Sequence, residues 1–267
     1  MMRPQLREHA RDALEDFIRH HVEMSGGEGV VIGLSGGLDS VTVSKLCCDA
    51  IGPDRGLNVY IPSATSSDQD LRDAKELCQL TGAELRIIDI CPAVEAFGSI
   101  LPGMDRKDMA GNVMARCRMV VLFHHARLMG RVVMGTSNKS EILTGYFTKF
   151  GDGGSDFCPL GDLYKTEVRE LARQIGVPRS TIDKAPSAGL WGGQTDEAEM
   201  GMTYDELDQV LFGVERNLDD ETIVSEASVP LEKVAKVRSM LRCSVHKRKM
   251  PLIPKLGVRT VGLDWRE

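Results

Sequence analysis

A glycine-rich hexapeptide in this chain of 267 residues combines groups that are suited to binding phosphate. It reads Ser35-Gly36-Gly37-Leu38-Asp39-Ser40, follows the apolar run 29–34 and precedes a stretch with helical spacing. Glycines in such a turn let backbone N–H groups converge on an anion, and the helix N-terminus adds partial positive charge. The hydroxyls of Ser35 and Ser40 can donate hydrogen bonds, and Asp39 can hold a divalent cation against the same phosphates. The pattern predicts a phosphate-binding loop.

Three other kinds of loop resemble this stretch in part. A Walker-type loop requires a lysine directly before its Ser or Thr, and here Asp39 precedes Ser40, which excludes it. The stretch Gly33–Gly37 also fits the nucleophile elbow of serine hydrolases, with Ser35 as nucleophile. That fold normally builds several strands before its nucleophile, whereas only one amphipathic helix, within residues 1–22, is predicted here. The third interpretation is a tight turn whose glycines serve geometry alone.

Composition limits the function classes. The net charge of −6 argues against nonspecific nucleic-acid binding, and no apolar run approaches the length of a membrane helix. The seven cysteines form no C-x-x-C pair, which is typical of reduced thiols in the cytoplasm. A basic cluster at 242–249 is the exception to the acidic balance, and such a cluster is usually a solvated face.

The apolar runs predict a doubly wound α/β fold. Strands are expected at 29–34, 57–61, 84–88 and 131–134, with helices between them at 67–80 and 108–129. This alternation indicates a parallel sheet with helices on both faces. Ligands of such sheets lie outside the carboxyl ends of the strands, so the phosphate loop and the segment 135–138 should meet at one crevice. We expect a single domain, with the nucleotide-binding core at 29–143.

The remaining residues, 144–267, are expected to supply substrate loops, a lid and C-terminal helices. The segment 144–161 is rich in glycine and lacks periodicity, which favours an ordered functional loop. Helices are expected at 166–175, 204–212 and 230–241. Between the first two, the segment Ala185–Gln194 combines small residues with Trp191, a composition typical of a lid that closes over a ligand.

Longer motifs carry a family resemblance. The loop Ser35–Ser40 resembles that of the N-type ATP pyrophosphatases, which have the adenine nucleotide alpha hydrolase-like fold. The segments 135–145 and 148–156 resemble the central signature of one branch, the NAD synthetase family. Further matches run in the family's order to about Pro251. Ser187 stands where many members have Thr, and Leu38 where many have Gln.

The resemblance implies roles for particular residues. Those expected to bind ATP are Gly33, Leu34, Ser35, Gly36, Gly37, Leu38, Asp39, Ser40, Thr136, Lys165 and Ser187. Those expected to contact the dinucleotide deamido-NAD are Arg116, Lys149, Asp156, His246 and Lys247. Asp39 and Glu141 would coordinate Mg²⁺, Asp152 would meet ammonia, and Asp39, Lys165 and Asp152 would serve catalysis.

The residue types agree with the chemistry that the resemblance implies. A carboxylate is a poor acyl donor, so the nicotinate carboxylate first attacks the α-phosphate of ATP to form an acyl adenylate, which ammonia then converts to an amide. The first step gathers anions and so requires cations and backbone donors. Asp152 could bind ammonium and remove its proton. The resemblance also implies a homodimer. Because no glutamine amidase domain is expected, the nitrogen donor should be free ammonia or ammonia supplied by another protein.

Each assignment has a structural alternative. Glu141 could cap a helix, and Asp152 and Asp156 could form turns beside glycine. Arg116 and Arg118 would otherwise be predicted as surface residues of one helix. Competing functions are another amide-forming or thiolating ATP pyrophosphatase, similar to GMP synthetase or a tRNA-thiolating enzyme, and a nucleotide sensor without catalysis. A serine hydrolase using Ser35 with His246 also stays open.

Overall fold

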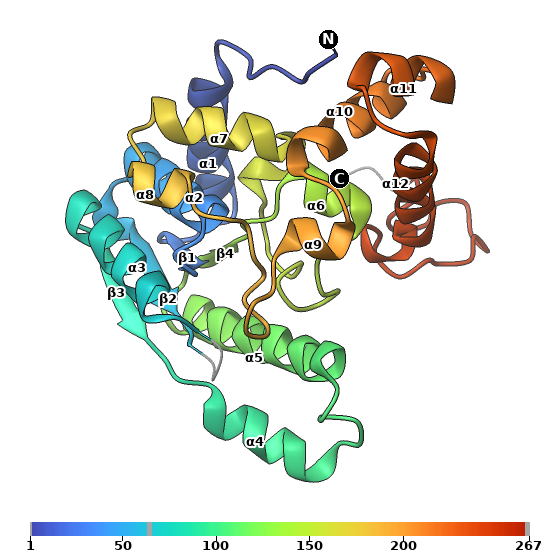
Figure 1. Cartoon of the computed structure of the whole chain (residues 1–267). Helices are drawn as coiled ribbons and strands as arrows, with labels where there is room; N and C mark the ends of the chain where they lie inside the picture. Colours follow the sequence, from blue (N-terminus) through green and yellow to red (C-terminus); the bar gives the residue numbers. More distant parts are fainter. Residues whose placement is uncertain (1, 63–65, 265–267) are drawn as a thin grey trace.

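The computed structural model describes residues 2–62 and 66–264, and a parallel sheet of four strands lies at its centre (Figure 1). The strands are β1 (Val30–Gly33), β2 (Gly56–Tyr60), β3 (Glu84–Ile87) and β4 (Val132–Met134), in the order β3-β2-β1-β4. Val31 of β1 lies opposite Leu57 on one side and Val133 on the other. The four strands predicted from apolar runs are confirmed, with their ends displaced by at most one residue.

The helices of the described residues alternate with the strands and then follow one another towards the C-terminus. They are α1 (Ala10–Met24), α2 (Leu38–Ile51), α3 (Asp68–Thr81), α4 (Cys91–Ile100), α5 (Lys107–Leu128), α6 (Lys139–Thr144), α7 (Lys165–Gln174), α8 (Arg179–Ile182), α9 (Asp196–Met200), α10 (Tyr204–Glu215), α11 (Asp220–Ala227) and α12 (Leu231–Cys243). Short 3₁₀ turns lie at Pro53–Arg55, Pro159–Asp162 and Val245–Lys247. The N-terminal helix begins later than predicted, and α4, α8, α9 and α11 were not predicted.

The two faces of the sheet bury alternate residues of β1. Val30 and Ile32 pack in one cluster with residues of α1, α2, α3 and α7, whereas Val31 packs in another with residues of α5. A strand that is covered on both faces must be apolar throughout, which explains why β1 is an unbroken apolar run. The predicted doubly wound α/β fold is confirmed.

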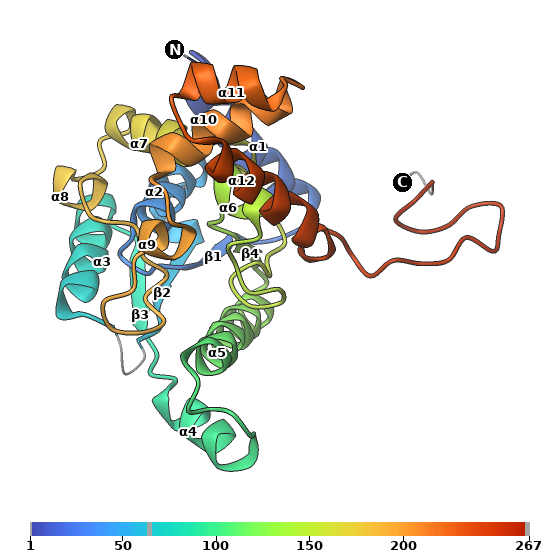
Figure 2. The ribbon, with the colours of Figure 1, turned by 45° about the vertical axis from the view of Figure 1, so that its right-hand side comes forward.

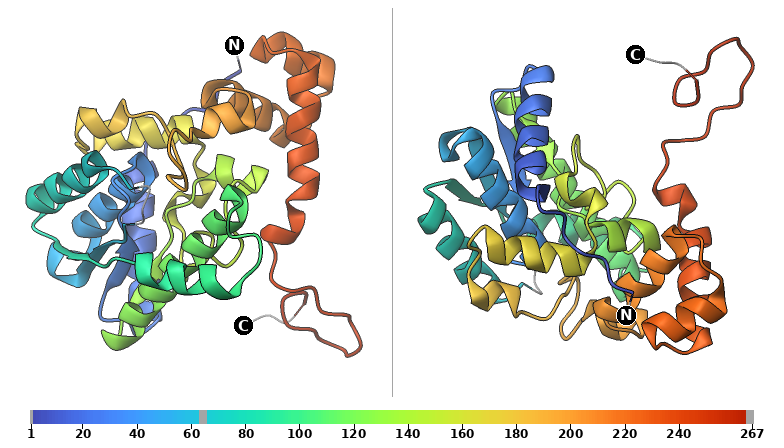
Figure 3. Two further views of the ribbon diagram at one scale, coloured as in Figure 1. Left: turned by 60° about the horizontal axis from the view of Figure 1, so that its bottom comes forward. Right: turned by 90° about the horizontal axis from the view of Figure 1, so that it is seen from above.

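A third apolar cluster joins the C-terminal helices to the start of the chain. It contains Tyr204, Leu207 and Leu211 of α10, together with Val234 of α12 and Met2. These helices group at one side of the sheet, next to α6 and α7 (Figure 3). Beyond them the chain leaves the body as an extended tail (Figure 2). No helix in residues 2–62 and 66–264 is long and apolar enough to cross a bilayer.

A buried carboxylate fastens α10 to the two helices that approach the carboxyl edge of the sheet. Asp208 accepts hydrogen bonds from the Ser140 hydroxyl of α6 and from the backbone N–H and hydroxyl of Thr166 in α7, the last two at 2.8 Å. Burial raises the pKa of Asp208 to about 6, against 3.8 for an ordinary aspartate. The folded protein therefore binds this proton more tightly than the unfolded chain.

We predict that Asp208→Ala lowers the free energy of unfolding by about 2–4 kcal/mol, because it leaves buried donors without an acceptor. Asp205→Ala, exposed on the same helix, should cost less than about 1 kcal/mol. Because the folded-state pKa is raised, the contribution of Asp208 makes stability fall as pH rises from about 4 to about 6 and stay level above that. Urea unfolding of the parent and both variants across this pH range measures the two effects. A loss below about 1 kcal/mol for Asp208→Ala would contradict the predicted cost, and a parent stability that does not fall across the range would contradict the pH dependence.

Candidate active site

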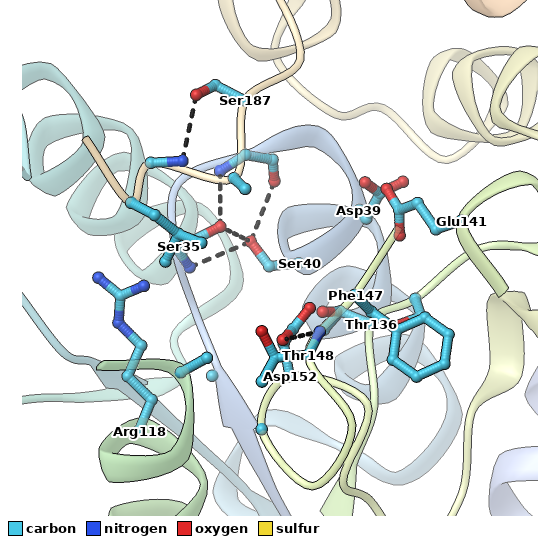
Figure 4. A pocket seen from close by; sticks show the side chains of 18 of the residues that line it. Ser35, Asp39, Ser40, Arg118, Thr136, Glu141, Phe147, Thr148, Asp152 and Ser187 are labelled. Atoms are coloured by element: carbon cyan, nitrogen blue, oxygen red, sulfur yellow. Dashed lines mark hydrogen bonds between the residues drawn. The ribbon is translucent and has the colours of Figure 1, made fainter. Parts of the chain in front are cut away.

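The phosphate loop joins the end of β1 to the start of α2, at the carboxyl edge of the sheet. Gly36 has a φ of +77°, and a Cβ atom there would lie 2.3 Å from the carbonyl oxygen of Asp70, so only glycine fits. The hydroxyl oxygens of Ser35 and Ser40 are 3.0 Å apart, and Gly37 N donates to Ser35 Oγ at 3.2 Å (Figure 4). The loop is thus braced by its own hydroxyl groups.

This loop forms one wall of a cavity of about 490 Å³. The other walls come from the ends of β2 and β4, from α5, and from the segments 145–154 and 184–194. Of the residues predicted to bind ATP, those that line the cavity are Gly33, Leu34, Ser35, Gly37, Leu38, Asp39, Ser40, Thr136, Lys165 and Ser187. Segments far apart in the sequence therefore meet at the crevice that the strand order predicted.

Two carboxylates and one lysine form the charged centre of the cavity. The Lys165 ammonium forms a hydrogen-bonded ion pair with Asp39, and its Nζ lies 3.6 Å from Glu141 Oε1. Burial and the neighbouring Asp39 raise the pKa of Glu141 to about 8. Burial alone would lower the pKa of Lys165, but Asp39 and Glu141 outweigh it and raise that pKa. Lys165 therefore stays charged and offsets the repulsion between the two carboxylates.

The positions of these carboxylates are set by a helix cap. Asn138 caps the N-terminus of α6. Its side-chain oxygen accepts a hydrogen bond from Glu141 N at 3.1 Å, and its backbone N–H donates to the Glu141 carboxylate at 3.3 Å. Its amide also donates to Asp39 Oδ1 at 3.3 Å. Glu141 does cap a helix, as the structural alternative proposed, but it faces the cavity as well.

The donor set fits Mg²⁺. Asp39 and Glu141 both line the cavity and both approach Lys165, so they would be the protein ligands. Mg²⁺ commonly binds one or two carboxylates and completes its octahedral shell with substrate phosphates and water. The loop Ser35–Ser40 contains Asp39, so phosphates bound by that loop would lie within reach of the metal.

A glycine-rich loop brings Asp152 to the opposite wall. Thr148 N donates to Asp152 Oδ1 at 2.9 Å (Figure 4). The Thr148 hydroxyl donates to Asn112 Oδ1 of α5 at 3.0 Å. At Gly151 a Cβ atom would lie 2.9 Å from that of Ala115, so the loop approaches α5 closely. Burial raises the pKa of Asp152, although the Thr148 hydrogen bond and nearby cations oppose the shift.

The residues predicted to contact the dinucleotide are not brought together in this cavity. Lys247 lines it, with its ammonium donating to the carbonyls of Gly145 and Phe147 at 2.8 Å. Arg116, Lys149 and His246 form a separate chain of contacts, in which Lys149 Nζ donates to the His246 carbonyl at 2.7 Å. Ser35 and His246 are therefore not arranged as a hydrolase pair.

Asp156 lies apart from both groups. Its carboxylate accepts a hydrogen bond from the backbone N–H of Val133 at 2.7 Å, on the side of β4 that faces away from β1. The backbone of the same residue donates to the Val133 carbonyl at 3.0 Å. This pairing fixes the glycine-rich loop to the sheet, which is a structural task that the carboxylate performs in addition to any contact with substrate.

The sequence of this chain is similar to those of known proteins over most of its length. A family model described as NAD synthase matches residues 10–251. The chain belongs to the NAD synthase family. It is 43% identical over 249 residues to the NH(3)-dependent NAD(+) synthetase of Methanococcoides burtonii, covering 92% of this chain and 95% of that protein.

Solved structures agree on the fold. An NMN synthetase from Francisella tularensis superimposes with a TM-score of 0.82 at 37% identity, and an NH3-dependent NAD synthetase from Campylobacter jejuni with a TM-score of 0.78 at 32% identity. Each alignment covers 92% of this chain and 98% of the other. The family resemblance inferred from the motifs is thus confirmed over nearly the whole length of these relatives.

In this NAD synthase family member, the predicted lid residues Ala185–Gln194 lie over the cavity and are fastened at both ends. Before the segment, Lys184 Nζ contacts Asp70 and Asp73 of α3 at 2.6 Å each. After it, the Asp196 carboxylate accepts a hydrogen bond from Ala188 N at 3.0 Å. Gln194 accepts from Leu190 N at 2.8 Å. Between these anchors, Ser187 is exposed at the cavity wall.

If the Ser187 hydroxyl binds ATP, Ser187→Ala should raise the KM for ATP by about 2- to 12-fold, which corresponds to the 0.5–1.5 kcal/mol of a neutral hydrogen bond. Ser180→Ala, exposed on α8, should leave it unchanged. The parent protein should be cleaved more slowly within 187–194 when ATP and deamido-NAD are present. Equal cleavage with and without both ligands would show that the segment is not a lid.

The sequence did not indicate several of the side chains that shape this site. Arg118, expected at the surface in the absence of family information, lines the cavity, as do Asn112 and Lys184. Asn138 and Asp196 are buried. The one available signal was spacing: Arg118 lies two positions after Arg116, so the two cannot share a face of α5.

Proposed function

We propose that this chain is an ammonia-dependent NAD synthetase, a ligase that joins ammonia to the nicotinate carboxyl of deamido-NAD while ATP is converted to AMP and pyrophosphate. The observation that carries the proposal is that the Ser35–Ser40 loop and the Asp152 loop line the same cavity. An activated carboxyl held between them would be in reach of both phosphate and ammonia. The curated relative from Methanococcoides burtonii supports the same activity.

In the first step, a nicotinate carboxylate oxygen attacks the α-phosphorus of ATP. The bond from that phosphorus to the bridging oxygen breaks, and pyrophosphate leaves with the electron pair. The phosphate loop and the N-terminus of α2 would hold the leaving phosphates. We propose that Asp39 and Glu141 hold Mg²⁺, which when bound neutralises phosphate charge. Lys165 would then turn from these carboxylates to the phosphates.

In the second step, ammonia attacks the acyl carbon, the bond to the AMP oxygen breaks, and AMP leaves. Ammonium predominates at neutral pH, so a group must hold it and accept a proton. We propose that Asp152 does so, because it faces the cavity from a loop that is fixed to α5 by Thr148. No residue of the chain becomes covalently attached to substrate.

The test is an assay of the purified protein with ATP, Mg²⁺, deamido-NAD and ammonium chloride, in which NAD, AMP and pyrophosphate are measured. We expect the three products in equal amounts. Formation of ADP and phosphate instead would overturn the proposal. With glutamine in an ammonia-free preparation, we expect no NAD, and NAD formation there would contradict the choice of ammonia as nitrogen donor.

One structural neighbour is named for NMN, so nicotinate mononucleotide belongs in the same assay as a second candidate substrate. We propose the dinucleotide as the preferred substrate because the curated relatives are named for NAD. The second half of the dinucleotide would find further cations at or beyond the cavity wall, namely Arg116, Lys149 and Lys247. A higher kcat/KM for the mononucleotide would reverse this choice.

Three further expectations belong to the proposal. We propose that the protein works in the cytoplasm, with its seven free cysteines kept reduced. We propose that it is a homodimer, which sedimentation of the purified protein tests. We also propose that residues 29–143 form the nucleotide-binding core and 144–267 supply the substrate loops and C-terminal helices, with 1–22 packed against the core.

A further inference from the structure

An arginine outside the predicted site faces the cavity from α5. Arg118 lines the cavity and its Nε donates to the carbonyl of Ile61, just beyond the end of β2, at 3.2 Å. Figure 4 shows the side chain rising from α5 in the direction of the phosphate loop. Burial lowers the pKa of Arg118 from its ordinary value. An arginine guanidinium nevertheless stays protonated in proteins, so Arg118 is a cation at the cavity wall, where hydrogen bonds to it are stronger than in water.

The packing of α5 fixes where this guanidinium lies. One turn further along the helix, Leu122 Cδ1 lies 3.2 Å from the position of a Cβ at Gly33, at the start of the phosphate loop. One residue after Arg118, Met119 Cγ lies 3.1 Å from that position at Gly154 in the Asp152 loop. Arg118 thus stands on the wall between the two loops, and its charge interacts with Asp152.

Arg118 lines the cavity together with Lys165, Lys184 and Lys247. Lys165 is paired with Asp39, and Lys184 with Asp70 and Asp73. Arg118 donates a hydrogen bond to the Ile61 carbonyl, which helps to position the guanidinium, and its positive charge interacts with Asp152 and Asp70. An arginine in that setting can offer two parallel N–H groups to a phosphate or carboxylate.

We propose that Arg118 is a catalytic residue of the adenylation step, in which its guanidinium binds the α-phosphoryl group as the substrate carboxylate attacks. This inference rests on the proposed function. The carboxylate oxygen bonds to the α-phosphorus, the bond to the β-phosphate oxygen breaks, and pyrophosphate leaves. The acyl phosphate formed must lie between the phosphate loop and Asp152, and Arg118 is on the wall that connects them.

A purely structural role is the competing explanation, because the bond to Ile61 could simply fasten β2 to α5. The experiment measures adenylation alone, as pyrophosphate released in a single turnover with ATP, Mg²⁺ and deamido-NAD and without ammonium. Arg118→Gln should slow this step by about 10²- to 10³-fold, the usual effect of losing one donor to a developing charge. The KM for ATP should change by less than about threefold.

Two further variants separate charge from packing. Arg118→Lys can keep the bond to Ile61 and the charge but not the paired donors, so it should recover only part of the rate. Arg118→Ala should regain activity when guanidinium chloride is added at low concentration, which a structural contact would not produce. Arg127→Gln, exposed on the same helix, is the matched control and should release pyrophosphate at the parent rate.

The outcomes are distinct. A normal single-turnover rate in Arg118→Gln, or a slow rate without guanidinium rescue in Arg118→Ala, would overturn the role of Arg118. Failure of the parent protein to release pyrophosphate with deamido-NAD would instead overturn the proposed function. If the parent protein is active and Arg118→Gln changes only the KM for ATP, Arg118 binds ATP and has no part in the adenylation step.

Discussion

Asp39→Asn should lower turnover by about 10³-fold or more at saturating Mg²⁺. The substitution keeps the size of the side chain but removes the charge that balances Lys165 and would hold the metal against the phosphates. Stabilisation of transferring phosphoryl charge by a bound metal is worth several kcal/mol, and about 4 kcal/mol corresponds to a 10³-fold change in rate. Steady-state formation of NAD at increasing Mg²⁺ measures the effect.

The fold should survive Asp39→Asn because a second carboxylate can take over the lysine. Glu141 Oε1 already lies 3.6 Å from Lys165 Nζ, and without Asp39 the repulsion that raises the pKa of Glu141 is gone. Asp49→Asn is the matched control, since Asp49 lies on the same helix and pairs with Lys45 at 2.6 Å outside the cavity. Turnover of Asp39→Asn within tenfold of the parent protein would show that Asp39 is not a metal ligand.

The local parts of this site could be predicted from the sequence because their signals are local. A buried strand of a doubly wound sheet is an unbroken apolar run, and the loop Ser35–Ser40 carries its glycines and hydroxyls within six residues. The strands and the fold class followed from such runs. Helix ends were less well placed: the N-terminal helix, expected within residues 1–22, begins at Ala10 and ends at Met24.

Features that depend on distant contacts could not be predicted in this way. From the sequence alone, Lys165 would be predicted as a solvated residue at the start of a helix. It is buried, and its ammonium pairs with the carboxylate of Asp39, 126 positions away in the sequence. Arg118 was expected at the surface because helical spacing separates buried from exposed faces and contains no pattern for a polar side chain facing a cavity. The roles of Arg116, Lys149, Asp156 and His246 remain predictions from the family resemblance.

Asp152→Asn should separate the two halves of the reaction. Adenylation should continue within about threefold of the parent rate, because the phosphate loop, Lys165 and the metal ligands are untouched. Amide formation should fall by about 10²- to 10⁴-fold, the range for loss of a general base. The asparagine can still accept the hydrogen bond from Thr148 N, so the loop should keep its shape. Pyrophosphate release without ammonium and NAD formation with it measure the two steps separately.

The pH profile of amide formation gives the same assignment an independent check. Burial raises the pKa of Asp152, so in the parent protein the carboxylate becomes protonated, and the second step slows, at a higher pH than for an exposed aspartate. In Asp152→Asn the break due to this carboxylate should be lost and the rate should follow the fraction of free ammonia alone, whereas Asp183→Asn, exposed beside α8, should retain both the break and the rate. Equal losses of adenylation and amide formation in Asp152→Asn would mean that Asp152 shapes the cavity as a whole. A selective loss of the second step, together with a rate that follows free ammonia alone, is what removal of a group that binds ammonium and accepts its proton must produce.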